Sequence, residues 1–296
     1  STSMTLRDLE YLVALADTRH FGRAAERCHV SQPTLSAQLR KLEDYLGVPL
    51  IERRPRRAAL TPAGLAVVAR ARRMLQDADD IRALARASQD PFAGHLKVGL
   101  IPTLGPYLLP RVAPRIAKAL PKLQLMLHEY QTAPLVERTL SGELDLAILA
   151  LPADTKGLVT RSLFAEAFLV AMPESHRLAA KKRVRAADLA DDKLLLLEEG
   201  HCLRDQALEV CERVGTEEQD FRATSLETLR QMVAAGLGVT LLPRLAAEGP
   251  FASARGLTTR PFAPPAPSRV IGAAWRRSTS RGEAIRAVCD IVARAG

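Results

Sequence analysis

Cys202 is the residue of this chain best placed to do chemistry. It follows His201 and lies just ahead of Arg204, near which the sequence predicts the start of a helix. A neighbouring cation and a helix N-terminus both stabilise a thiolate, which is the form of cysteine that attacks a peroxide. The sulfenic acid formed in that attack is reversible when a second thiol condenses with it. The pattern therefore predicts a reactive thiol at Cys202.

The chain has 4 cysteines in 296 residues, which is too few for a disulfide scaffold. Cys28 and Cys289 share a helix face with apolar residues, so we expect both to be buried and inert. Cys211 is the candidate second thiol. Together with His201 and Cys202 it would supply only three metal ligands, without the paired spacing of a zinc site, and no metal is predicted.

The elements ahead of this thiol begin with three amphipathic segments. The spacing of apolar residues predicts helices over 6–18, from Phe21, and from an N-cap at Ser31. A sharp break at 29–30 separates the second and third helices, an arrangement that enters the major groove of DNA. Glutamine pairs with adenine and arginine with guanine there. The residues predicted to contact DNA on the outer face are Ser31, Gln32, Pro33, Thr34, Ser36, Gln38 and Arg40.

A dense run of arginines follows the third helix. Residues 49–52 resemble a short strand, and we expect 53–57 to form the turn of a wing that contacts phosphates or the minor groove. The wing contacts are Arg53, Arg54, Arg56 and Arg57. The net charge of +9 favours a polyanionic partner. A helix or a charge run alone fits a solvated surface, but the two in this order predict double-stranded DNA as the partner.

A long helix and a second domain complete the chain. Thr61 and Pro62 begin a helix to about Arg86, whose narrow stripe of Val68, Ala71, Leu75, Ala78 and Ala85 suggests pairing with another helix. A hinge is expected at 88–94. Apolar strands then alternate with helices, which predicts an α/β domain with a mostly parallel sheet. The strands are expected at 95–101, 123–129, 144–151, 167–172, 193–198, 239–243 and 269–275.

Several of these segments resemble the LysR-type transcriptional regulators. The resemblance rests on residues 9–12, 21–25, 30–36, 41–43 and 60–64. It implies an α/β fold class with three parts: a winged helix-turn-helix at 4–61, a linker helix and hinge at 62–94, and a two-lobed, periplasmic-binding-protein-like effector domain at 95–296. Lobe I would span about 95–165 and 268–296, and lobe II about 166–267. The family further implies a homodimer or homotetramer on promoter DNA of two-fold symmetry, acting with RNA polymerase.

The cysteine segment, residues 200–211, resembles the redox segment of the peroxide-sensing members of that family. The resemblance implies a reversible Cys202–Cys211 disulfide, with hydrogen peroxide as the reacting ligand and no cofactor. A thiol reductant of the glutaredoxin or thioredoxin type would reset it. The polar groups implied around the peroxide are Thr103, Thr132, His201 and Arg269. Asp205 is expected to orient His201 or Arg204, or to favour the helix start.

Geometry makes such a disulfide a switch. If residues 202–211 are even partly helical, the two sulfurs start about 10 Å or more apart, whereas a disulfide needs Cα atoms within roughly 7 Å. Oxidation would then refold the segment and alter whatever packs on it.

Two rival functions remain. In the first, a small organic inducer binds between the lobes, Thr103 and Thr132 line that cleft, and the cysteines are incidental. In the second, the chain is a thiol peroxidase; its DNA-reading domain argues against an enzyme.

No apolar run is long enough to span a bilayer and the N-terminus lacks a secretory pattern, so we expect a cytoplasmic protein.

Overall fold

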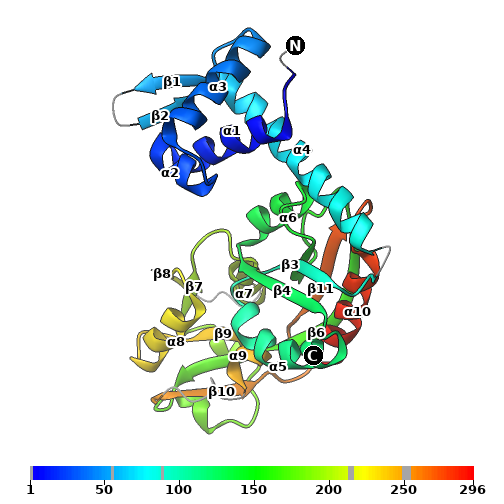
Figure 1. The fold of residues 1–296 in the computed structure, drawn as a ribbon. Helices are drawn as coiled ribbons and strands as arrows, with labels where there is room; N and C mark the ends of the chain where they lie inside the picture. Colours follow the sequence, from blue (N-terminus) through cyan, green and yellow to red (C-terminus); the bar gives the residue numbers. More distant parts are fainter. Residues whose placement is uncertain (1–2, 55–56, 88–89, 213–216, 249–254) are drawn as a thin grey trace. The chain divides into compact units, whose positions relative to one another are not determined.

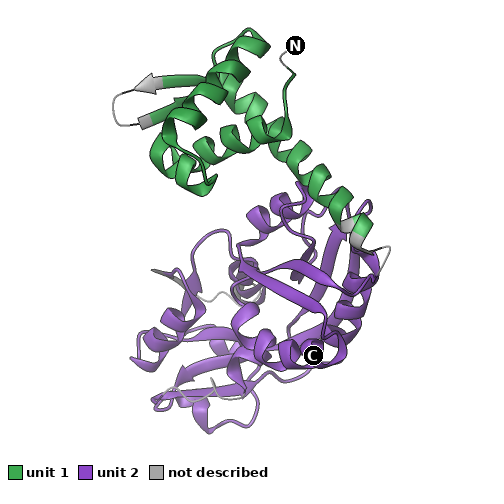
Figure 2. Ribbon diagram, viewed as in Figure 1, with its two compact units in different colours: residues 1–85 green, residues 86–296 purple. Residues whose placement is uncertain are grey.

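The structure is a computed structural model that describes residues 3–54, 57–87, 90–212, 217–248 and 255–296. The chain divides into two compact units, Ser1–Ala85 and Arg86–Gly296 (Figure 2). None of its described helices is both long and apolar enough to cross a membrane. The finer domain and lobe boundaries expected from the sequence stay predictions.

The first unit contains a three-helix cluster, a two-stranded hairpin and a long helix (Figure 1). Its elements are α1 (Leu6–Thr18), α2 (Phe21–Arg27), α3 (Gln32–Leu46), β1 (Ile51–Arg54), β2 (Arg57–Leu60) and α4 (Pro62–Ala87). Leu12, Leu35 and Leu39 are fully buried where the three helices meet. The predicted helix-turn-helix is therefore confirmed, including the N-cap at Ser31.

The wing differs from the expected turn. Arg53 and Arg54 end strand β1 and Arg57 begins β2, with Arg54 opposite Arg57 in the antiparallel register. Pairing of Ile51 with Leu60 places apolar residues at the base of the hairpin, which leaves the arginines at its tip. The side chains of these three arginines, and Arg56 as a whole, lie outside the described residues. The hairpin is anchored by Glu43, whose carboxylate accepts hydrogen bonds from the main-chain N–H groups of residues 50 and 51 at 2.8 and 3.0 Å.

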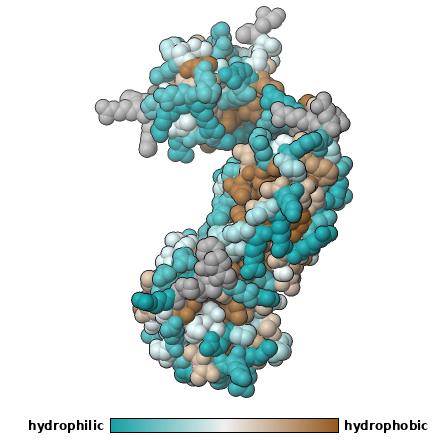
Figure 3. Space-filling view, turned by 60° about the horizontal axis from the view of Figure 1, so that its bottom comes forward, coloured by the Kyte–Doolittle hydropathy of each residue, from teal (hydrophilic) through white to brown (hydrophobic). Residues whose placement is uncertain are grey.

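Helix α4 begins as expected, but its apolar faces are used differently. Val68 and Ala71, expected to form part of the pairing stripe, are buried, and Val68 belongs to the core of the DNA-binding unit itself. The large apolar side chains left exposed farther along α4 are Met74, Ile81 and Leu84. These three side chains form a second apolar stripe on α4, and pairing of two copies along this helix stays a prediction. Figure 3 draws one face of the molecule, on which hydrophobic side chains (brown) lie between hydrophilic ones (teal).

The second unit combines a seven-stranded sheet, a two-stranded sheet and surrounding helices (Figure 1). Its strands are β3 (Gly94–Leu100), β4 (Leu123–Glu129), β5 (Leu146–Leu151), β6 (Leu158–Pro173), β7 (Lys193–Leu197), β8 (Glu217–Ala223), β9 (Thr240–Pro243), β10 (Leu257–Pro261) and β11 (Ser268–Arg276). Its helices are α5 (Gly105–Ala119), α6 (Thr132–Leu140), α7 (Cys202–Glu212), α8 (Leu226–Ala234), α9 (Arg244–Ala247) and α10 (Gly282–Ala293), with 3-10 turns η1 (Arg177–Ala180) and η2 (Ala186–Leu189).

The expectation of a mostly parallel sheet is wrong. The large sheet runs in the order β10-β6-β11-β5-β3-β4, and only the pairs β3–β4 and β3–β5 in it are parallel. Strand β6 is antiparallel to β11 along its first half and to β9 and β10 along its second half. A strand covered on both faces is apolar whatever the direction of its neighbours, so the apolar runs did not reveal this direction.

Candidate functional site

One face of helix α3 is exposed to solvent, because the opposite face packs against the rest of the DNA-binding unit. Three leucines of this helix, Leu35, Leu39 and Leu42, are buried in the core that it shares with α1 and α2. The Ser31 hydroxyl accepts a hydrogen bond from the Thr34 main-chain N–H at 3.2 Å and lies 2.7 Å from the Thr34 hydroxyl. The predicted DNA contacts that are exposed are Ser31, Gln32, Pro33, Thr34 and Arg40.

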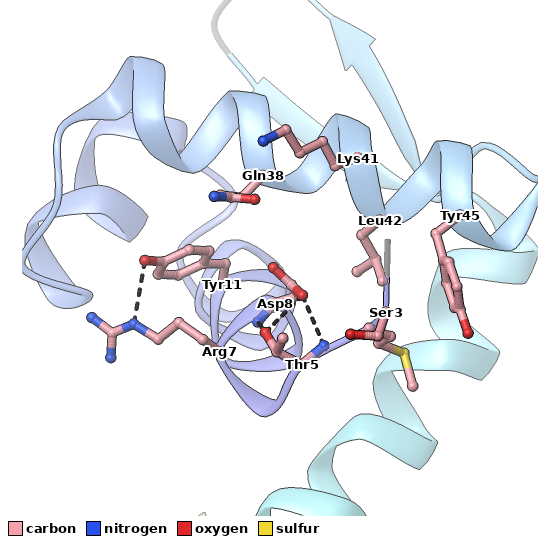
Figure 4. Close-up of a pocket in the computed structure, with 10 residues that line it drawn as sticks. Ser3, Thr5, Arg7, Asp8, Tyr11, Gln38, Lys41, Leu42 and Tyr45 are labelled. Carbon is pink, nitrogen blue, oxygen red and sulfur yellow. Dashed lines mark hydrogen bonds between the residues drawn. The ribbon is translucent and has the colours of Figure 1, made fainter. Parts of the chain in front are cut away.

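Gln38 and Ser36 lie at the margins of that face and are half-buried. Gln38 lines a pocket of about 250 Å³ between α3 and α1, across from Tyr11 and beside Lys41 (Figure 4). On the α1 side, the Arg7 guanidinium donates to the Tyr11 hydroxyl at 3.2 Å. Lys41 is exposed on the polar side of α3 but was left out of the predicted contact set.

The helix predicted to start near Arg204 begins at Cys202, which is the first residue of α7. Gly200, just ahead of it, has φ +92°, a conformation that favours glycine. A Cβ atom at Gly200 would lie 2.4 Å from the side-chain oxygen of Gln131, the N-cap residue of α6. The loop therefore presses against the start of α6, and Cys202 stands at the N-terminus of its own helix.

Cys202, Thr132 and Asp205 line one cleft of about 530 Å³. Cys202 is half-buried, so its thiol is both shielded and reachable. The Thr132 hydroxyl oxygen is buried and has no hydrogen-bond partner among the described residues. Asp205 is exposed in the first turn of α7, where a carboxylate favours the helix start. The cleft thus offers a small polar molecule a hydroxyl and a thiol together.

His201 and Arg204, the two cations expected beside Cys202, interact with other groups. His201 is 6% exposed, and burial lowers the pKa of its imidazole, although Glu198 and a hydrogen bond with the Thr224 main chain act in the other direction. His201 is therefore neutral at pH 7. Arg204 is buried and donates to the main-chain oxygen of Leu197 at 3.3 Å. Cys202 itself stands at the positive N-terminal end of α7.

Thr103 and Arg269 meet each other outside the lining of that cleft. The Arg269 guanidinium donates to the Thr103 hydroxyl at 3.0 Å and to the Thr103 main-chain oxygen at 3.1 Å. Its Nε donates to Glu166 at 2.8 Å, and all three residues are buried. The predicted peroxide set is thus divided into a cleft group, Thr132 with Cys202, and a buried group, Thr103 with Arg269. Glu166 was missed because an isolated acidic residue in a strand gives no signal of its partner.

Cys211 belongs to the same continuous helix as Cys202, and its side chain lies outside the described residues. Nine residues of α-helix separate the two Cα atoms by about 14 Å, on opposite sides of the helix axis, since nine residues make about two and a half turns. That separation is twice the roughly 7 Å that a disulfide allows. The pair cannot be bridged while α7 is intact.

The two remaining cysteines are buried, as expected, and their inertness stays a prediction. Cys28 and Cys289 are buried, and loss of hydration raises the pKa of both thiols, that of Cys289 to about 11. In the described part of the chain, no three His, Cys, Asp or Glu side chains gather as metal ligands would.

Both units match known protein families. Residues 6–65 match the bacterial regulatory helix-turn-helix proteins of the lysR family, and residues 89–296 match the LysR substrate binding domain. The DNA-binding transcriptional dual regulator OxyR of Escherichia coli K12 is 49% identical over 295 residues, covering 97% of this chain and 96% of that protein.

Solved structures agree with this. A full-length OxyR variant from Pseudomonas aeruginosa has a TM-score of 0.77 and 44% identity, covering 99% of this chain and 95% of the other. A hydrogen-peroxide-bound OxyR mutant from Corynebacterium glutamicum has a TM-score of 0.67 and 36% identity, covering 99% and 93%. The expectation of a regulator rather than an enzyme is confirmed by these matches. The chain belongs to the LysR family of DNA-binding transcriptional regulators.

Proposed function

We propose that this regulator senses hydrogen peroxide through Cys202 and converts its oxidation into a change in transcription of oxidative-stress genes. The observation that carries the proposal is the cleft lined by both Cys202, half-buried at the N-terminus of α7, and Thr132, whose hydroxyl has no hydrogen-bond partner within the described part of the chain. The relatives named for peroxide-inducible genes cover nearly the whole chain, which supports the same reading.

The first chemical step is a two-electron oxidation of sulfur. The Cys202 thiolate attacks one peroxide oxygen, the O–O bond breaks, and hydroxide leaves with the bonding pair and takes a proton to become water. Thr132 donates to or accepts from the bound peroxide, and neutral His201 is a further hydrogen-bonding group. By the family resemblance, Arg269 and Thr103, which lie outside the lining of the cleft, come next to the departing hydroxide once the peroxide is bound, and the guanidinium stabilises its charge. Asp205 holds the start of α7.

The second step closes the disulfide. The Cys211 thiol attacks the sulfur of the Cys202 sulfenic acid, the S–S bond forms and water leaves. Because the two Cα atoms stand about 14 Å apart in the intact helix, the step requires α7 to unwind. A dithiol reductant of the glutaredoxin or thioredoxin type reverses it by thiol–disulfide exchange. Refolding of α7 is thereby the link between oxidation and DNA binding.

The proposal extends to the partners. The exposed α3 residues read promoter DNA in the major groove, and the arginine hairpin contacts its backbone or minor groove. Two copies pair through the exposed α4 stripe, and two such dimers form a tetramer on a DNA site of two-fold symmetry. The oxidised protein acts on RNA polymerase, and all of this takes place in the cytoplasm.

A transcription assay tests the proposal. A reporter promoter bound by the full-length chain is measured with and without peroxide, using Cys202→Ser and, as the matched control, Cys28→Ser. We expect the response to vanish in Cys202→Ser and to persist in Cys28→Ser, since Cys28 is buried in the DNA-binding unit. A full peroxide response in Cys202→Ser would rule the proposal out.

The size of the cleft favours one second candidate, a small organic inducer. A volume of about 530 Å³ far exceeds the space that peroxide needs and falls in the range of small-molecule sites. In that case the reporter would respond to the inducer in Cys202→Ser as it does in the native chain, because the thiol would only line the site.

A further inference from the structure

Glu166 and Arg269 form a buried ion pair in the second unit. They face each other on the antiparallel strands β6 and β11, and Arg269 Nε lies 2.8 Å from Glu166 Oε2. Glu166 is 3% exposed and Arg269 is 2% exposed. Both charges have therefore lost their hydration, and each depends on the other for compensation.

Both oxygens of the Glu166 carboxylate are engaged. Oε2 accepts from Arg269, and Oε1 accepts from the main-chain N–H of Leu245, the second residue of α9, at 2.8 Å. Bonds from two directions fix the plane of the carboxylate. The carboxylate in turn fixes the Nε edge of the guanidinium, because that bond has a strong directional preference.

The opposite edge of the guanidinium points at Thr103. One terminal nitrogen donates to the Thr103 hydroxyl and the other to its main-chain oxygen. These two bonds and the one to Glu166 occupy three of the five N–H groups of an arginine. A continuous chain of hydrogen bonds thus runs from Leu245 through Glu166 and Arg269 to Thr103, which follows strand β3.

A purely structural role explains this arrangement poorly. Strands β6 and β11 are already joined by a long main-chain ladder, so no ion pair is needed to hold them together. A well-packed apolar pair often stabilises such a site as much as a buried ion pair does, because desolvation offsets the attraction between the charges. What an apolar pair would not provide is a guanidinium held in one orientation beside Thr103.

We propose that Glu166 is a positioning residue for the reaction of peroxide with Cys202. It holds Arg269 so that the guanidinium and the Thr103 hydroxyl stabilise the departing hydroxide together. It also keeps this buried site neutral overall. The proposal rests on the proposed function, because Arg269 has this role only if peroxide reacts at Cys202.

The test compares two reagents on the full-length chain. Loss of the Cys202 thiol is followed by mass spectrometry with hydrogen peroxide, whose reaction releases hydroxide, and with iodoacetamide, whose reaction releases iodide. Glu166→Gln is expected to slow the peroxide reaction by about tenfold or more while leaving the iodoacetamide reaction unchanged. An equal slowing of both reactions, or no slowing of either, would overturn the proposal.

Two further variants keep the test decisive if Glu166→Gln does not fold. Glu166→Asp retains the charge but is one methylene shorter, and we expect it to lower the ratio of the peroxide rate to the iodoacetamide rate. The double variant Glu166→Gln/Arg269→Gln removes both charges, and we expect it to react with peroxide as slowly as Arg269→Gln alone. An unchanged ratio in Glu166→Asp, or multiplied effects in the double variant, would contradict the positioning role.

The same data separate this inference from the proposed function. A native chain whose Cys202 fails to react with peroxide would sink the proposed function and this inference with it. A native chain that reacts, with Arg269→Gln slow and folded Glu166→Gln unimpaired, would sink the positioning role of Glu166 alone.

Discussion

At the scale of single residues, burial sets the charge of His201. Burial lowers the folded pKa of its imidazole below the ordinary value of about 6.5. The folded chain therefore binds fewer protons than the unfolded chain as the pH falls below that value. The stability that His201 contributes is complete above about pH 6.5 and is lost as the pH falls from there toward the folded pKa.

We accordingly predict that acidification from about pH 7.5 to about pH 5.5 lowers the free energy of unfolding more in the native chain than in His201→Gln. Urea unfolding at the two pH values measures this, with the exposed His95→Gln as the control that should behave like the native chain. Identical pH dependence in the native chain and His201→Gln would show that the imidazole is not held neutral by the fold.

Gly64 is fixed by a close approach of main chains. A Cβ atom there would lie 2.1 Å from the carbonyl oxygen of Leu50, which is backbone and has little freedom to move. We predict that Gly64→Ala destabilises the DNA-binding unit by about 1–3 kcal/mol. Thermal unfolding followed by circular dichroism measures the loss, and Ala63→Ser, at an exposed position of the same helix, should change little. Equal melting temperatures for the two variants would contradict the account.

At the scale of elements, α7 is the part of the molecule that oxidation must change. It is a single helix of 11 residues that contains both Cys202 and Cys211. The disulfide and the intact helix exclude each other. We therefore predict that peroxide treatment reduces the helical circular dichroism signal, by no more than the fraction of the chain's helical residues that α7 contains. The reduction should be absent in Cys211→Ser and should reverse with a dithiol. A disulfide-bonded chain with undiminished helix content would contradict this.

Elements with a strong local signal were predictable from the sequence, and those defined by their partners were not. The leucine spacing and the Ser31 cap of α3 indicated its position. Helix α7 begins two residues before the predicted start, because His201, which precedes Cys202, is not one of the usual N-cap residues Ser, Thr, Asp, Asn and Gly. Only 167–172 of β6 has a continuous apolar run, so its first half, with side chains alternately covered and exposed against β11, was missed.

The same division holds in the candidate site. Residue type and the family resemblance identified Cys202 and Thr132, and the structure places both on one cleft. The neutral state of His201 and the bond from Arg204 to Leu197 depend on burial, which is a property of the whole fold. The ion pair between Arg269 and Glu166 joins residues 103 positions apart, so the local spacing of residues does not predict it.

At the scale of the whole molecule, the exposed stripe of α4 is the surface that we expect a second copy to cover. Ile81 is the most exposed of its apolar side chains, at 67%. We predict that Ile81→Lys shifts the assembly toward smaller species, because the change places a charge in an apolar helix pairing. Analytical ultracentrifugation over a range of concentrations measures this shift.

Asp79→Lys is the matched control, since it adds a lysine to the same helix about 140° around the axis from Met74 and breaks only an exposed pair with Arg82. It should assemble like the native chain. If Ile81→Lys and Asp79→Lys assemble equally well, another surface holds the copies together.

The central claim is that peroxide acts on one thiol in particular and through it on the whole molecule. The most direct measurement is a mass-spectrometric map of all four thiols in the native full-length chain after less than one equivalent of peroxide. The account predicts that Cys202 and Cys211 are lost together as a disulfide while the buried Cys28 and Cys289 remain free thiols. Oxidation of Cys28 or Cys289 with Cys202 left intact would contradict it.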